Sequence, residues 1–80
     1  MAKKFQSMKA KKLLAILKRS PLNYQIVSST LGSHKKLDSI SGYPRINFSF
    51  HDKVTIPGYT VKDILVNQVG LTEQEALNLL

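Results

Sequence analysis

The sequence of 80 residues contains no cysteine, and acidic residues are few, with five against twelve Lys and Arg. Without cysteine, neither a disulfide nor a thiolate metal site can support the fold. Two histidines and five carboxylates are a poor basis for a zinc site, so we expect no metal and no cofactor. The hydrophobic fraction of 42% suffices for a globular core and is too high for a disordered chain.

Long apolar runs are also missing. The longest is "LLAIL" at residues 13–17, whereas a membrane span needs about 20 apolar residues. Residues 1–20 contain no apolar h-region and no small-residue cleavage site, so we expect no signal peptide. We therefore expect a soluble, cytoplasmic protein with no membrane partner. Its length fits a single domain over residues 1–80, with residues 1–6 as a flexible start.

Acidic residues are almost absent from the first part of the chain. Residues 1–45 hold ten Lys and Arg and one acid, Asp38, for a net charge of +9. Residues 46–80 hold two Lys and four acids, for a net charge of −2. Such a basic segment favours a polyanionic partner, and nucleic acid is the leading candidate. The alternative is a basic surface that is merely well solvated.

The first predicted element is a helix. Ser7 can accept a backbone N–H as its N-cap. Apolar residues then follow at the spacing of one helix face, at Ala10, Leu13, Leu14 and Leu17. Pro21 cannot continue a helix, so we expect the helix to end before it.

Three strands are predicted next, at residues 24–30, 34–40 and 45–51. Gly32 and the "SGYP" stretch at 41–44 turn the chain between them, which implies antiparallel pairing.

The remaining residues predict a connector and two helices. Residues 52–58 form a short irregular connector, because Pro57 and Gly58 interrupt it. A helix follows from about 59 to 69 and ends at Gly70. Thr72 and Glu75 have the spacing of a capping box that opens a short last helix. The fold class is therefore α+β: a three-stranded antiparallel sheet with helices packed on one face and a short C-terminal helix.

The alternation of the strands assigns residues to the two faces of this sheet. If Leu37 points inward with Ile46, Phe48 and Phe50, then His34, Lys36 and Asp38 point outward. On the neighbouring strand the outward positions are Arg45, Asn47, Ser49 and His51. Lys35 lies on the inward side at the sheet edge, from which its ammonium can reach solvent.

This outward face has the groups that RNA cleavage requires. A ribose 2′-hydroxyl can attack its own 3′-phosphate without a metal, given a base, an acid and cations. Imidazole can serve either proton role near neutral pH, so His34 is the candidate catalytic residue. Lys35, Lys36, Arg45 and His51 are candidate RNA contacts, and Ser33 joins them because its turn can present backbone N–H groups to a phosphate. A single histidine is, however, more often an ordinary surface residue.

The sequence lacks the motifs of two other kinds of chemistry. No GxxxxGK phosphate loop is present, so a small-molecule nucleotide ligand is not expected. No nucleophile elbow is present, which disfavours a Ser-His-Asp hydrolase.

Four stretches resemble, in order and spacing, the HicA family of small toxins from bacterial and archaeal toxin–antitoxin modules. They are "GSHKKL" (32–37), "INFSFHD" (46–52), "IPGYTVKDIL" (56–65) and "VGLTEQEALNLL" (69–80). The resemblance implies a fold like the double-stranded-RNA-binding domain, with α-β-β-β-α order. It implies an mRNA interferase, a metal-independent endoribonuclease that arrests translation, with His34 as the catalytic histidine. It also implies mRNA and an acidic HicB antitoxin as partners.

The sequence departs from the family in the first strand. Family members often carry basic residues before the glycine, where this chain has Ser28, Ser29, Thr30 and Leu31. The interval from "YQIV" to Gly32 is also about one residue longer, which leaves open whether Ile26 or Val27 faces inward. Two other functions stay open: an RNA-binding module that does not cleave, and a chain that mainly binds a partner protein.

Overall fold

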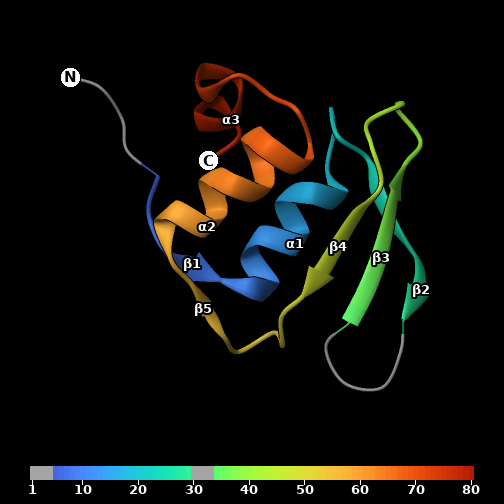
Figure 1. Ribbon diagram of the computed structural model, residues 1–80, viewed down its shortest axis with the longest axis horizontal. Coiled ribbons are helices and arrows are strands. Elements are labelled where there is room, and N and C mark those ends of the chain that lie inside the picture. Colours follow the sequence, from blue (N-terminus) through green and yellow to red (C-terminus); the bar gives the residue numbers. More distant parts are fainter. Residues whose placement is uncertain (1–4, 30–33) are drawn as a thin grey trace.

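The computed structural model describes residues 5–29 and 34–80 and confirms the α+β class (Figure 1). Thr30 and the predicted turn at 31–33 lie outside these residues, as does most of the predicted flexible start. The elements follow the chain in this order: β1 (Met8–Lys9), α1 (Ala10–Lys18), β2 (Tyr24–Ser29), β3 (His34–Ser39), β4 (Ile46–Ser49), β5 (Thr55–Ile56), α2 (Gly58–Lys62), the π-helix η1 (Asp63–Gln68) and α3 (Glu73–Asn78).

The three-stranded antiparallel sheet is confirmed. Its strand order is β2-β3-β4, and Leu37 in the central strand pairs with Ile26 on one side and Ile46 on the other. The helices all lie to the same side of this sheet (Figure 1). The other side, which faces away from them, is where the predicted outward residues lie.

A second sheet corrects the prediction for the N-terminus and for residues 52–58. Met8–Lys9 pairs with Thr55–Ile56 as a two-stranded antiparallel ribbon. The helix therefore begins at Ala10, and Ser7 does not cap it. A main-chain oxygen accepts the hydrogen bond at the start of the helix instead: the N–H of Ala10 donates to Val54 O at 2.8 Å. Two-residue strands are too short for alternation to reveal, and their pairing spans almost fifty residues of sequence.

The predicted helix over 59–69 is present, but its second half is a π-helix. The N–H of Val69 donates to Ile64 O, five residues back, at 3.0 Å. Gly70 then ends the helix with φ +94°, as expected for a glycine at that position. The capping box is confirmed: Thr72 Oγ1 accepts the N–H of Glu75 at 3.1 Å, and Glu75 Oε1 accepts the N–H of Thr72 at 3.0 Å.

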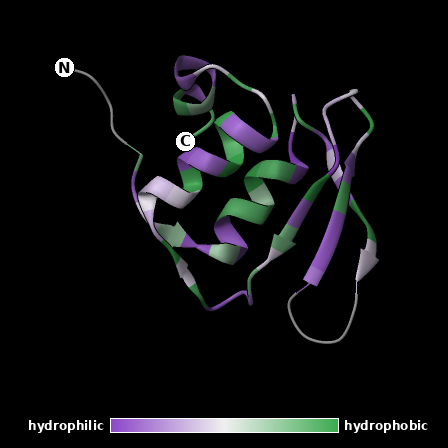
Figure 2. Cartoon of the chain, viewed as in Figure 1, coloured by the Kyte–Doolittle hydropathy of each residue, from purple (hydrophilic) through white to green (hydrophobic). Residues whose placement is uncertain are grey.

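One apolar core joins the helices to the sheet. Leu13 and Leu17 of α1 pack with Leu37 and Phe48 of the sheet and with Leu65 of η1, and all five are fully buried. Hydrophobic segments accordingly line the space between the helices and the sheet in Figure 2. In the part of the chain that the structure describes, no helix is both long and apolar enough to cross a membrane.

Candidate functional site

The outward face of the sheet carries His34 at the start of β3. The register places His34 opposite Ser49 and Lys36 opposite Asn47, and residues opposite each other share a face. Leu37 and Ile46 are fully buried on the other face. All four outward side chains are exposed, so the predicted orientation is confirmed.

These residues surround an open depression of about 280 Å³. Among the described residues its lining comprises Ser28, His34, Lys35, Lys36, Asn47 and Ser49. This set offers one imidazole, two ammonium groups, two hydroxyls and an amide, and it contains no carboxylate. Hydrogen-bond donors and positive charge without a competing anion suit a phosphate group. We call this depression the His34 depression.

A second depression, of about 540 Å³, adjoins the first. Its described lining residues are Lys35, His51, Asp52 and Lys53, and of these Lys35 also lines the first depression. The two histidines, which the alternation pattern assigned to one face, thus lie in neighbouring depressions. Strand β4 ends at Ser49, and the N–H of Val54 donates to His51 O at 3.0 Å, so the chain turns at His51.

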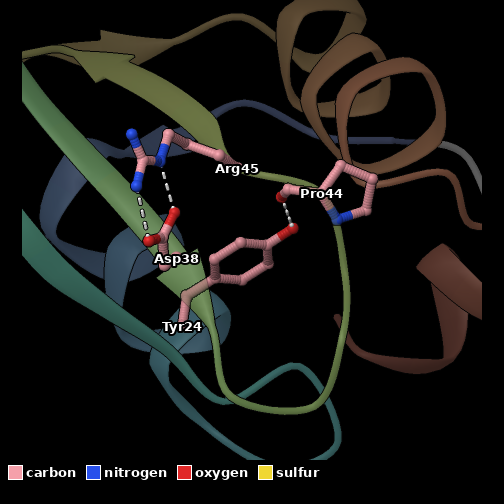
Figure 3. Close-up of polar contacts among 4 residues, drawn as sticks. All are labelled: Tyr24, Asp38, Pro44 and Arg45. Atoms are coloured by element: carbon pink, nitrogen blue, oxygen red, sulfur yellow. Dashed lines mark hydrogen bonds and ion pairs between the residues drawn. The ribbon is translucent and has the colours of Figure 1, made fainter.

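Arg45 lies at the other end of the outward face and is paired. Its Nε donates to Asp38 Oδ1 at 2.5 Å and its Nη2 to Asp38 Oδ2 at 2.8 Å (Figure 3). This bidentate bond holds the pKa of the Asp38 carboxyl below its usual range. Four residues of extended strand, about 13 Å, separate Asp38 from His34. The structure therefore does not bring Arg45 to the His34 depression.

An extra residue in β2 brings Ser28 to this depression. Ile26 pairs with Leu37 and Ser28 with Lys36, so Val27 is the bulged residue between them. Ile26 thus lies opposite the buried Leu37, although 38% of it remains exposed, and Val27 is 46% exposed.

The sequence analysis named some of the residues that line the two depressions and missed others. Asn47 and Ser49 were placed outward but not assigned a role, and pairing them with β3 by register would have added them. Ser28 and Lys53 were missed, since only the bulge and the turn after β4 bring them there. Ser33 lies outside the described residues.

Metal-ligating side chains do not gather in the described ranges 5–29 and 34–80: no three of His, Asp or Glu lie together. Comparisons with protein-family models, with curated proteins and with solved structures found no match to this chain.

Proposed function

We propose that this protein is a metal-independent endoribonuclease, the toxin of a toxin–antitoxin module similar to HicA, with His34 as the general acid or base. The observation that carries the proposal is the His34 depression itself. An exposed imidazole lies there together with two lysines, with no carboxylate among the described lining residues.

The residues of the His34 depression contribute a proton transfer and the stabilisation of charge to the reaction. The ribose 2′-oxygen bonds to phosphorus while the bond from phosphorus to the 5′-oxygen breaks, leaving a 2′,3′-cyclic phosphate and a free 5′-hydroxyl. His34 either takes the 2′-proton or gives the proton that the 5′-oxygen needs, and solvent water exchanges the other proton. Lys35 and Lys36 stabilise the additional negative charge on the phosphorane, and Asn47 and Ser49 donate hydrogen bonds to its oxygens.

The family likeness of the fold belongs to this proposal. α1, β2, β3, β4 and α2 follow one another in the α-β-β-β-α order of the double-stranded-RNA-binding domain. The ribbon of β1 and β5 and the helix α3 are additions to that order. The basic segment at residues 1–45 suits an acidic HicB-like antitoxin, which would mask His34 in the cytoplasm until mRNA is to be cut.

One observation favours a second function, an RNA-binding module that does not cleave. His51, the other residue suited to proton transfer near neutral pH, lies in the neighbouring depression. A single imidazole with lysines is a sufficient phosphate-binding site even if no proton is transferred.

The first prediction separates these functions. We expect His34→Ala to abolish both RNA cleavage and growth arrest, and we expect cleavage by the parent to persist with a chelator present. Because His34 is exposed, the free energy of unfolding should change by no more than about 0.5 kcal/mol. Cleavage is measured on purified protein with a labelled RNA, and folding by urea denaturation.

His51→Ala is the matched control, since it removes the other histidine from the neighbouring depression. We expect it to retain measurable cleavage. Cleavage by His34→Ala at the parent's rate would refute the mechanism. Binding of RNA by the parent without any cleavage would establish the second function. An adjacent gene for a small acidic protein, whose co-expression relieves growth arrest, is expected only for the toxin.

A further inference from the structure

The turn that follows β4 is fixed to the start of α1. The N–H of Ala10 donates to Val54 O at 2.8 Å, and the N–H of Lys11 donates to Asp52 O at 3.3 Å. Lys9 Nζ adds a hydrogen bond to Lys53 O at 3.2 Å. His51, Asp52 and Lys53 are therefore held in place by the helix, although all three are exposed.

This turn forms most of the second depression, and Lys35 of β3 gives the depression a net positive charge. Lys35 and Lys53 line it together with His51, and Asp52 is the one acid among the described lining residues. Lys9 Nζ, fixed on Lys53 O, adds a further positive charge beside the turn. The net charge of the second depression still favours an anion, but less strongly than that of the His34 depression, whose described lining residues include no acid. The second depression is thus suited to bind a phosphate.

Lys35 connects the two depressions. It points toward the inward side, opposite Phe48, near the start of β3, and its side chain is partly exposed there. The His34 depression lies on the outward face, and the turn lies beyond the end of β4. A strand of RNA that passes from one depression to the other would therefore round the end of the sheet at Lys35.

We propose that the second depression is a phosphate subsite for the nucleotide next to the scissile one, with Lys53 as its principal contact. This inference rests on the proposed function and extends it: the site takes single-stranded RNA longer than a dinucleotide. The two depressions lie side by side, so one flexible strand can supply an adjacent phosphate to each. A paired helix would have to bend around the sheet end, whereas a single strand is free to do so.

The test compares how tightly the parent protein and single-lysine variants bind a short and a long RNA probe. The probes are a 2′-O-methyl dinucleotide and a longer 2′-O-methyl oligonucleotide, which cannot be cleaved because the attacking hydroxyl is blocked. We expect Lys53→Ala to weaken binding of the longer probe roughly three- to tenfold and to leave the dinucleotide unchanged. Lys36→Ala should weaken both probes, because Lys36 lines only the His34 depression.

Lys18→Ala is the matched control. It removes the same charge at the last turn of α1, about 12 Å along the helix from its start, and should change neither affinity. If Lys53→Ala binds the longer probe as tightly as Lys18→Ala does, the subsite is refuted while the proposed function stands. If the parent binds neither probe, both proposals fail. Circular dichroism confirms that each variant is folded.

Discussion

Tyr24 ties the sheet to the turn before β4. Its side chain is only 2% exposed, and its hydroxyl donates to Pro44 O at 2.6 Å (Figure 3). Burial raises the pKa of this hydroxyl from its ordinary value of 10.0 to about 12, with smaller contributions from Tyr43 and Asp38. The folded protein therefore resists losing this proton more than the unfolded chain does.

The sign of this shift gives the second prediction. The neutral Tyr24 stabilises the fold fully below pH 10.0, and that stabilisation is lost as the pH rises toward about 12. Tyr24→Phe should lower the free energy of unfolding by about 1 kcal/mol at neutral pH, because Pro44 O loses its donor. It should also remove part of the decline above pH 10, measured by urea denaturation at increasing pH.

Tyr59→Phe is the matched control for Tyr24, because Tyr59 is 79% exposed. We expect it to follow the parent at every pH. A decline above pH 10 that is equally steep in Tyr24→Phe and in the parent would contradict this role for the buried hydroxyl.

The orientation of single residues was predictable wherever the strand is regular. Ile46 and Phe48 alternate with Asn47 and Ser49, so a period of two was enough to place them, and Leu37 then placed His34 and Lys36. The bulge at Val27 interrupts this period in β2. Side-chain alternation cannot be extrapolated across a bulge, which is why the contribution of Ser28 became visible only in three dimensions.

At the scale of elements, the N-terminal segment crosses the start of α2 at Gly58. A Cβ atom there would collide with the carbonyl oxygen of Phe5 and stand 3.0 Å from its carbonyl carbon. Only a glycine allows this approach. The segment leads directly into β1, whose partner β5 ends two residues before Gly58. The glycine at position 58 is thus explained by packing and needs no functional role.

Gly58→Ala is the third prediction. Alanine favours a helix by about 1 kcal/mol over glycine, whereas forcing a side chain into a filled space costs about 1–3 kcal/mol. Because the collision is with backbone, which cannot swing aside, we expect a net loss of about 1–2 kcal/mol in the free energy of unfolding. Urea denaturation measures it. An increase in stability would show that Phe5 does not press on Gly58.

The elements that were predicted are those with local signals. The spacing of Thr72 and Glu75 predicts the start of α3, and Gly70 predicts the end of η1. The β1–β5 ribbon has no such signal, since it depends on contact between Met8 and Ile56, which are distant in sequence. The π-helix was not predicted from the sequence. Ile64 and Leu65 are buried in it, and their adjacent apolar positions would equally suit the buried face of an α-helix.

At the scale of the whole molecule, folding concentrates basic residues at one end. Hydrogen bonds fix the start of α1, with Lys9 and Lys11, to the turn at Asp52 and Val54, and this turn adjoins the end of β4 opposite His34. The last turn of α1 lies toward the other end of the sheet, where Tyr24 pairs with Ser39. The molecule is 41 Å long, and exposed charges are screened over about 10 Å at 0.1 M salt. Under the proposed function, position, more than net charge, therefore decides which lysines attract RNA.

The salt dependence of binding tests this statement and is the last prediction. For single strands, the logarithm of the binding constant falls with the logarithm of the salt concentration by about 0.7 for each phosphate neutralised. Binding of the longer 2′-O-methyl oligonucleotide is titrated at several salt concentrations. We expect Lys36→Ala and Lys53→Ala each to reduce the slope by about 0.7, and the double variant by about twice that.

Lys62→Ala provides the comparison for these slopes. Lys62 pairs with Glu73 at 2.6 Å, and it belongs to α2, which joins the core from the helical side of the sheet. It carries the same charge as Lys36, so a general attraction between a basic protein and RNA would lower the slope equally in both variants. Equal slopes would refute a localised site. A reduced slope in Lys36→Ala and Lys53→Ala, with Lys62→Ala unchanged, would place the RNA at the end of the sheet where His34 lies.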